Sequence, residues 1–190
     1  MKKLLTTVLL ATALGAAMQA QAAGDENYAG VAIGARTHYG LDCSGAVRCD
    51  RNASGGGKIY LGKQLEKNFA AEVMAFRLGS AEGALKNGSS RVAGSARAHG
   101  LAATGVFFQP LGDFTVKARL GVGYLRGEAD FAAGGGTSKS AFAPVVGLGA
   151  SYALSPQVSL NADWDRLPAK LGNGDKVTTS LFSLGLSFRF

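Results

Sequence analysis

The chain has 190 residues, a length that suits one domain, and it is rich in glycine (28 residues) and poor in proline (4 residues). Its formal net charge of +7 comes from basic residues that are dispersed along the sequence, without the basic cluster and interleaved aromatic residues of a nucleic-acid interface. Beyond residue 22 no apolar stretch approaches the ~20 residues of a transmembrane helix, which leaves a soluble secreted protein or a β-barrel.

Residues 1–22 have the organisation of a secretory signal peptide. Two lysines precede an apolar run from Leu4 to about Ala17, and Ala20-Gln21-Ala22 fits a cleavage site. The alternative, a membrane-anchoring helix, requires a run of ~20 apolar residues. We therefore expect cleavage after Ala22 and one domain over residues 23–190. Its net charge would be +5, because cleavage removes two basic residues and no acidic one.

The remaining sequence alternates between apolar residues and small or polar ones with a period of two, which indicates β-strands with one apolar face. The alternation is clearest in "FTVKARLGVGYL" from Phe114 and in the terminal "TTSLFSLGLSFRF". It is less regular in the first half, and the fourth strand is rather apolar on both faces, so its orientation is left unassigned. In chain order we expect eight strands, at about 27–38, 57–66, 69–79, 95–108, 114–127, 141–154, 157–166 and 177–190.

The faces and connections of these strands favour an eight-stranded antiparallel up-and-down transmembrane β-barrel over a soluble sandwich. The second face carries mainly Gly, Ser and Ala with isolated charges, which suits a crowded lumen inside a barrel whose apolar face meets lipid. Short periplasmic turns and long outer loops are typical of such barrels, and an even strand number places both termini in the periplasm. Short connections near Glu66, 109–113 and 155–157 alternate with longer ones around 39–56, 80–94, 128–140 and 167–176.

Aromatic residues fall where two membrane interfaces are expected. Tyr124 and Trp164 lie near the long connections. A random scatter of aromatic residues is the alternative. Near the short turns lie Phe108, Phe114, Tyr152, Phe188 and Phe190.

Charged residues on the predicted lumen side are candidates for an interior network. A lone buried ion is costly, so these side chains are expected to pair with one another or to be hydrated. A gated ion path and a structural polar core both fit, and the narrow interior of eight strands favours the core. The candidates are Arg36, Glu72, Lys117, Arg119, Asp163 and Arg189.

The only two cysteines, Cys43 and Cys49, fall in the first predicted outer loop. A protein that crosses the oxidising periplasm is expected to join them in a disulfide, which would close a small ring and contribute ~2 kcal/mol. A zinc site is the alternative, but no histidine or further cysteine lies beside the pair.

Two arginines, Arg77 and Arg126, lie on the outward faces at the loop-side ends of the third and fifth predicted strands. In that position they could extend to the interface and bind lipopolysaccharide phosphates. Ordinary surface arginines are the alternative.

Several stretches resemble the membrane domain of the outer-membrane protein A (OmpA) family and its short relatives. They are "KIYLGKQLEKNFAAEVMAFRLG" from Lys58, "DFTVKARLGVGYLRGEA" from Asp113 and the terminal "SLFSLGLSFRF". The resemblance implies an eight-stranded barrel with a polar interior, in which Glu72 and Arg119 match the family's interior glutamate and arginine. It also implies that the terminal aromatic residues, Phe188 and Phe190, form the signal read by the barrel-assembly machinery.

The sequence departs from this family in two respects. Ser151 and Ser159 stand where the best-known member carries further interior charges. The peptidoglycan-binding domain of longer members is not expected, because the sequence stops at the last strand.

Catalysis has little support in the sequence. The only histidines, His38 and His99, lie neither in the His-x-Ser arrangement of outer-membrane lipid A deacylases nor with the Asp-Ser pair of the barrel palmitoyltransferases. The glycine triplets at 55–57 and 134–136 precede strands rather than helices, which disfavours a phosphate-binding loop. We expect no enzymatic activity, no metal and no cofactor.

The sequence therefore predicts a monomeric, integral outer-membrane barrel with a structural, surface-presenting role. Lipopolysaccharide, outer-membrane lipid and the barrel-assembly machinery are the expected partners, and nucleic acid is not. Two alternatives remain: a loop-mediated adhesin or serum-resistance factor, and a narrow channel for ions or small solutes.

Overall fold

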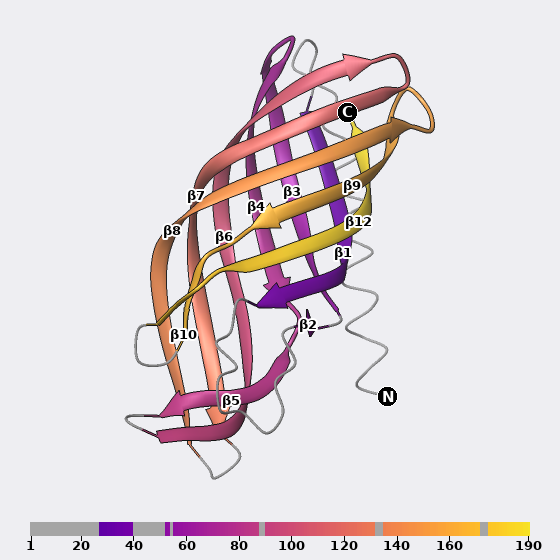
Figure 1. Ribbon diagram of the computed structural model, residues 1–190. Helices are drawn as coiled ribbons and strands as arrows, with labels where there is room; N and C mark the ends of the chain where they lie inside the picture. The colour runs from indigo at the N-terminus through magenta and orange to yellow at the C-terminus, as the bar shows by residue number, and fades with distance from the viewer. Residues whose placement is uncertain (1–26, 40–51, 54, 88–89, 132–134, 172–174) are drawn as a thin grey trace, which may run out of the picture.

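Eight long antiparallel strands form a closed barrel in the computed structural model of the protein (Figure 1), which describes residues 27–39, 52–53, 55–87, 90–131, 135–171 and 175–190. No helix in these residues is long and apolar enough to span a membrane. The barrel strands are β1 (Asn27–Tyr39), β3 (Gly56–Glu66), β4 (Phe69–Leu78), β6 (Ser90–Leu111), β7 (Phe114–Phe131), β8 (Gly136–Ala153), β9 (Val158–Arg166) and β12 (Thr179–Arg189).

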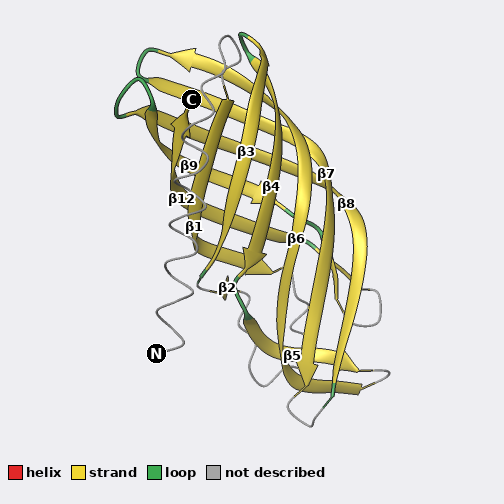
Figure 2. Cartoon of the chain, turned by 180° about the vertical axis from the view of Figure 1, so that it is seen from behind, coloured by secondary structure: helices red, strands yellow, loops and turns green. Residues whose placement is uncertain are grey.

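Each barrel strand pairs with the next one along the chain, and β12 pairs with β1 to close the sheet. The closing register runs from Tyr28 opposite Arg189 to Tyr39 opposite Thr179. Figure 2 shows β3, β4, β6, β7 and β8 side by side from behind. Closure leaves no barrel edge with unpaired backbone groups, the condition for strands that lie in hydrocarbon. The predicted up-and-down barrel is confirmed.

The two ends of the barrel differ. At the turn end, short turns at Lys67–Asn68, Gly112–Asp113 and 154–157 join neighbouring strands, and Asn27 lies beside Phe190. Gly112 has a φ of 67°, which a glycine adopts without strain. At the opposite, loop end lie four short strands: β2 (Asn52–Ala53), β5 (Ala81–Asn87), β10 (Ala169–Leu171) and β11 (Asp175–Val177).

The strands at the loop end are longer than the sequence predicted. Residues 80–94 were expected to form a loop, but β5 pairs with the extended β6 from Ala81 opposite Ala96 to Asn87 opposite Ser90. Strands β7 and β8 likewise continue into the expected loop 128–140. These polar, glycine-rich ends show no apolar alternation in the sequence, and pairing with a neighbouring strand keeps them extended.

Outward-facing side chains form a continuous apolar surface around the barrel. Ile33, Leu120 and Phe142 are 72%, 66% and 78% exposed. The orientation of β6 is now assigned, because Ala102, Thr104 and Val106 are buried whereas Leu101 is exposed. Small residues occupy both faces of β6, which explains why its sequence did not reveal the orientation.

Pairs of outward aromatic rings lie towards both ends of the strands. Phe114 and Tyr152 form one pair near the turn end, with ring centroids 4.8 Å apart. Tyr124 and Phe142 form another towards the loop end, 5.2 Å apart. Phe108 does not belong to the outward set. It occupies an inward position of β6, and its ring lies 6.0 Å from that of Tyr28 in an edge-on contact.

Strand β1 contains an irregularity that changes which residues face inward. The pairing of β1 with β12 shifts between Gly34 and Arg36. Beyond the shift Thr37 is buried, whereas Arg36 is exposed and stands opposite the outward Phe182. The expectation that Arg36 lies in the lumen is therefore wrong, because the additional residue of a β-bulge reverses the alternation.

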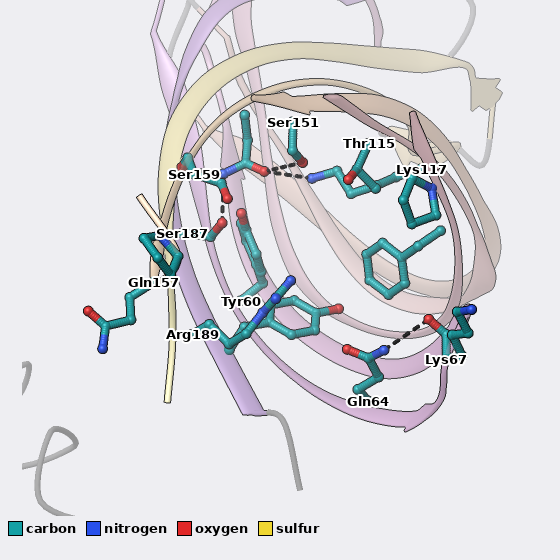
Figure 3. A pocket seen from close by; sticks show the side chains of 15 residues that line it. Tyr60, Gln64, Lys67, Thr115, Lys117, Ser151, Gln157, Ser159, Ser187 and Arg189 are labelled. Atoms are coloured by element: carbon teal, nitrogen blue, oxygen red, sulfur yellow. Dashed lines mark hydrogen bonds between the residues drawn. The ribbon is translucent and has the colours of Figure 1, made fainter. Parts of the chain in front are cut away.

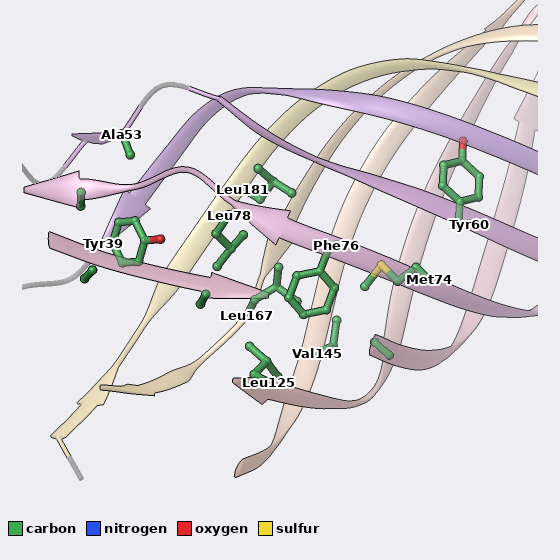
Figure 4. Close-up of a cluster of buried hydrophobic side chains, with 14 residues drawn as sticks. Tyr39, Ala53, Tyr60, Met74, Phe76, Leu78, Leu125, Val145, Leu167 and Leu181 are labelled. Atoms are coloured by element: carbon green, nitrogen blue, oxygen red, sulfur yellow. The ribbon is translucent and has the colours of Figure 1, made fainter. Parts of the chain in front are cut away.

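The loop-end half of the interior is filled by apolar side chains (Figure 4). We call this cluster the apolar plug. Its larger side chains are each at most 5% exposed, so they occupy the lumen rather than line an opening. They are Tyr39, Met74, Phe76, Leu78, Leu125, Val145, Leu167 and Leu181.

Candidate functional site

Six ionised side chains form the middle layer of the interior, between the apolar plug and the turn end. They come from four strands: β3, β4, β7 and β9. Three are cations and three are anions, so the group is neutral as a whole. Its members are Lys58, Glu72, Lys117, Arg119, Asp163 and Asp165, and all are buried.

Arg119 joins two carboxylates on one side of this interior network. Its Nε lies 2.8 Å from Oε1 of Glu72, and its Nη1 donates a hydrogen bond to Oδ1 of Asp165 at 2.7 Å. All three side chains are at most 1% exposed. The Tyr28 hydroxyl donates to the other oxygen of Glu72 at 3.2 Å. Arg119 thus holds β4 and β9 against β7 across the lumen.

Two lysines continue the network on the other side. Lys58 Nζ lies 2.5 Å from Oδ2 of Asp165 and 3.1 Å from Oδ2 of Asp163. Lys117 Nζ lies 3.3 Å from Oδ1 of Asp163 and donates to Oδ1 of Asn161 at 2.8 Å. Cations and anions therefore alternate along a chain that runs from Glu72 to Lys117. This order matters because a buried charge is tolerated when opposite charges and hydrogen bonds surround it.

Glycines of β8 provide the space for these carboxylates. A Cβ atom on Gly149 would collide with Oδ1 of Asp163, and one on Gly147 would collide with Oδ1 of Asp165. The two residues stand directly opposite these aspartates in the pairing of β8 with β9. The small lumen face seen in the sequence is thus the complement of the charged side chains that cross the lumen.

The structure places four of the six predicted lumen charges in this network: Glu72, Lys117, Arg119 and Asp163. Arg189 lies apart from them, exposed at the turn end, where it lines a cavity. Arg36 lies on the outer face, as described above.

Sequence reasoning missed Lys58 and Asp165. Asp165 follows Asp163 by two residues on the same strand, so the alternation that selected Asp163 applies to it as well. Lys58 shares its face of β3 with the inward Tyr60 and was detectable in the same way.

The outward arginines occupy one row near the loop end. Arg77 pairs with His99, which in turn pairs with Arg126, so their side chains share the outer face across β4, β6 and β7. All three are exposed. Arg126 donates to the Ser138 hydroxyl at 3.2 Å and lies 3.5 Å from Oε1 of Glu128.

Two other predictions lie outside the described residues. Cys43 and Cys49 fall in the segment 40–51, and the expected signal peptide falls in 1–26. The disulfide and the signal peptide stay predictions.

The interior network ties β3, β4, β7 and β9 together across the lumen. Each charge in the network has an opposite charge in contact, and the apolar plug closes the lumen beyond it. A solute that crossed the barrel would have to separate the buried ion pairs and then displace side chains such as Leu125 and Leu181, which are 1% and 0% exposed.

Comparisons with known proteins agree with this architecture. A family model described as "Outer membrane protein beta-barrel domain" matches residues 6–190 of the chain. No curated protein matches the chain.

Among solved structures, Neisserial surface protein A (NspA) has a TM-score of 0.62 at 16% sequence identity, with 88% of this chain and 99% of that chain covered. Ail, the attachment invasion locus protein of Yersinia pestis, has a TM-score of 0.56 at 16% identity, with coverage of 88% and 99%. The N-terminal β-barrel domain of Pseudomonas aeruginosa OprF has a TM-score of 0.53 at 10% identity, with coverage of 86% and 97%. At such identities the likeness shows the fold.

Proposed function

The chain belongs to the family of outer-membrane protein β-barrel domains, and we propose that its role in the Gram-negative envelope is structural and surface-presenting. The observation that carries this proposal is the sealed interior. A neutral ion-pair network and the apolar plug fill the lumen in series, while the outer surface is apolar. Such a barrel is suited to serve as a rigid anchor for the segments at its loop end.

The proposal includes an orientation and a set of partners. The short turns and both termini face the periplasm, and the loop end faces outward, the asymmetry typical of such barrels. Phe188 and Phe190 serve as the signal for the barrel-assembly machinery. The protein acts as a monomer, without enzymatic activity and without a cofactor.

A loop-mediated binding function is the second candidate. The β5–β6 hairpin extends the sheet at the loop end and carries paired strands where a plain loop was expected (Figure 1). The name of Ail describes attachment and invasion, and one Ail structure contains the heparin analogue sucrose octasulfate. At 17% sequence identity, the similarity of this chain to Ail concerns the fold alone. A channel is not proposed, because two barriers lie in series in the lumen.

A complementation experiment tests the proposed role. Cells that lack the protein are expected to be more sensitive to detergents and to large antibiotics. We expect resistance to return with the full barrel and equally with a barrel whose β5–β6 hairpin and 40–51 connection are shortened. Rescue by the full-length protein alone would replace the structural proposal with the loop-binding one. A deletion strain with wild-type resistance would contradict the structural role.

The outward arginine row gives a prediction about lipopolysaccharide. Added lipopolysaccharide is expected to raise the unfolding temperature of the barrel in detergent, because it binds the folded state. Substituting both Arg77→Ala and Arg126→Ala should reduce this increase, since each cation near an anionic lipid surface contributes about 1 kcal/mol. Lys63→Ala is the control, because Lys63 is an exposed residue near the turn end. An increase that is equal in the double variant and the wild type would exclude the arginine contacts.

A further inference from the structure

A cavity of about 260 Å³ occupies the turn end of the barrel interior (Figure 3). We call it the turn-end cavity. Lys117 and Asn161, both buried, lie at its inner end, next to the interior network. Its outer part is lined by Gln64 and Arg189, near the turn-end limits of β3 and β12, and by Lys67 and Gln157 of the short turns. The cavity is thus open towards the short turns and closed towards the network.

The walls of this cavity differ in chemistry. One wall consists of aromatic rings: Tyr28 contacts Tyr60 edge-on at 6.2 Å between centroids and Phe108 at 6.0 Å. Serine hydroxyl groups, including those of Ser151 and Ser187, form the polar wall, and Tyr60 lies beside Ser187 where the two walls meet (Figure 3). An apolar wall with a few placed polar groups is the usual composition of a small-molecule site.

Asn161 arranges the polar wall. Its side-chain oxygen accepts from Ser151 at 2.8 Å and from Lys117 at 2.8 Å, and its nitrogen donates to the Ser187 hydroxyl at 2.9 Å. The ammonium group of Lys117 is held by its hydrogen bond to Asn161 and by its ion pair with Asp163. The polar groups of the cavity are therefore held in fixed positions before a ligand enters.

The charge of the lining is one-sided. Three cations line the cavity, Lys67, Lys117 and Arg189, and no aspartate or glutamate among the described residues lines it. The acids of the interior network lie deeper and are already paired with Lys58, Lys117 and Arg119. Because Asp163 balances the charge of Lys117, the excess positive charge of the lining comes from Lys67 and Arg189, and it favours an anion over a cation or a neutral solute.

We propose that the turn-end cavity binds a small organic carboxylate, of about the size of a sugar acid. Its carboxylate would be directed towards Lys117, its hydroxyl groups towards the serine wall and its carbon atoms towards the aromatic wall. The volume corresponds to about nine water molecules at ~30 Å³ each, so an inorganic ion would fill only part of the cavity and would not use the rings. Lys67 and Arg189 would attract the anion at the entrance. This site is independent of the structural role proposed above.

Gluconate is the probe, with sorbitol as its neutral counterpart. The full chain, refolded in a zwitterionic detergent, is titrated at constant ionic strength while backbone amide shifts are followed by NMR. We expect saturable shifts centred on Lys117, Asn161 and Ser187 with gluconate and none with sorbitol. Equal shifts with chloride, equal shifts with sorbitol, or the absence of saturation would overturn the proposal.

Two variants locate the site. Substituting both Lys67→Gln and Arg189→Gln removes the entrance cations, which are exposed, and should weaken gluconate binding about tenfold. Substituting both Arg77→Gln and Arg126→Gln removes the same charge from the outer face at the other end and should leave binding unchanged. Equal effects of the two double variants would show attraction by overall charge alone and would overturn the site.

Discussion

Replacing Arg119 with methionine is expected to lower the free energy of unfolding of the barrel by about 3–5 kcal/mol, the usual effect of removing one partner from a buried ion pair. The guanidinium contacts Glu72 and Asp165, and all three side chains are at most 1% exposed. Its loss leaves the interior network with a net negative charge that water cannot solvate. Urea unfolding in lipid vesicles, followed by the fluorescence of Trp164, measures the change.

Arg126→Met is the matched control for Arg119→Met. Arg126 lies on the same strand, but its side chain is 52% exposed and its contact with Glu128 spans 3.5 Å. An exposed pair of this kind contributes about 0–1 kcal/mol. Equal destabilisation by the two substitutions would contradict a buried network.

A double variant separates the loss of charge balance from the loss of packing. Glu72→Gln combined with Arg119→Met restores neutrality, so it should be less destabilised than the sum of the two single variants. The same comparison made with Arg126→Met in place of Arg119→Met should be additive, because Arg126 lies on the outer face and has no contact with Glu72. Additivity in the first pair would show that the two charges are not coupled.

The sequence predicts which side chains face the lumen wherever the alternation of apolar and polar residues along a strand is regular. In β7 apolar residues occupy every second position from Phe114 to Tyr124 without interruption. The sequence therefore predicted correctly that Lys117 and Arg119 face the lumen. The same holds for Asp163 in β9. For these residues the neighbours along one strand contain all the information that is needed.

Pairing within the network could not be predicted, because it depends on closure of the sheet. Lys58 and Asp165 are 107 positions apart, and they meet because β3 and β9 lie across the lumen from each other. The predicted facing of Arg36 was wrong for a local reason. A single additional residue in β1 reverses the alternation, and the hydrophobic pattern of the sequence does not reveal it. The prediction that Phe108 faces outward was wrong because small residues occupy both faces of β6, so the sequence does not show the orientation of this strand.

Leu120→Arg is expected to destabilise the barrel in lipid vesicles by about 2–4 kcal/mol, the effect of arginine at the midplane of a bilayer on a transmembrane strand. Leu120 is 66% exposed on β7. The apolar alternation around it covers eleven residues, from Phe114 to Tyr124, close to the ~9–11 that a tilted strand needs to cross the hydrocarbon. Outward aromatic pairs mark both ends of this stretch, so Leu120 lies near its middle.

Gln109→Arg is the matched control, because Gln109 is an exposed residue of β6 close to the Gly112–Asp113 turn. Arginine near the interface costs about 0–1 kcal/mol. In a protein surrounded by water, a substitution at an exposed position changes stability by only about 0.5 kcal/mol in either direction. A difference between the two variants therefore measures the depth of Leu120 in hydrocarbon, and equal, small effects would show that this apolar face does not meet lipid.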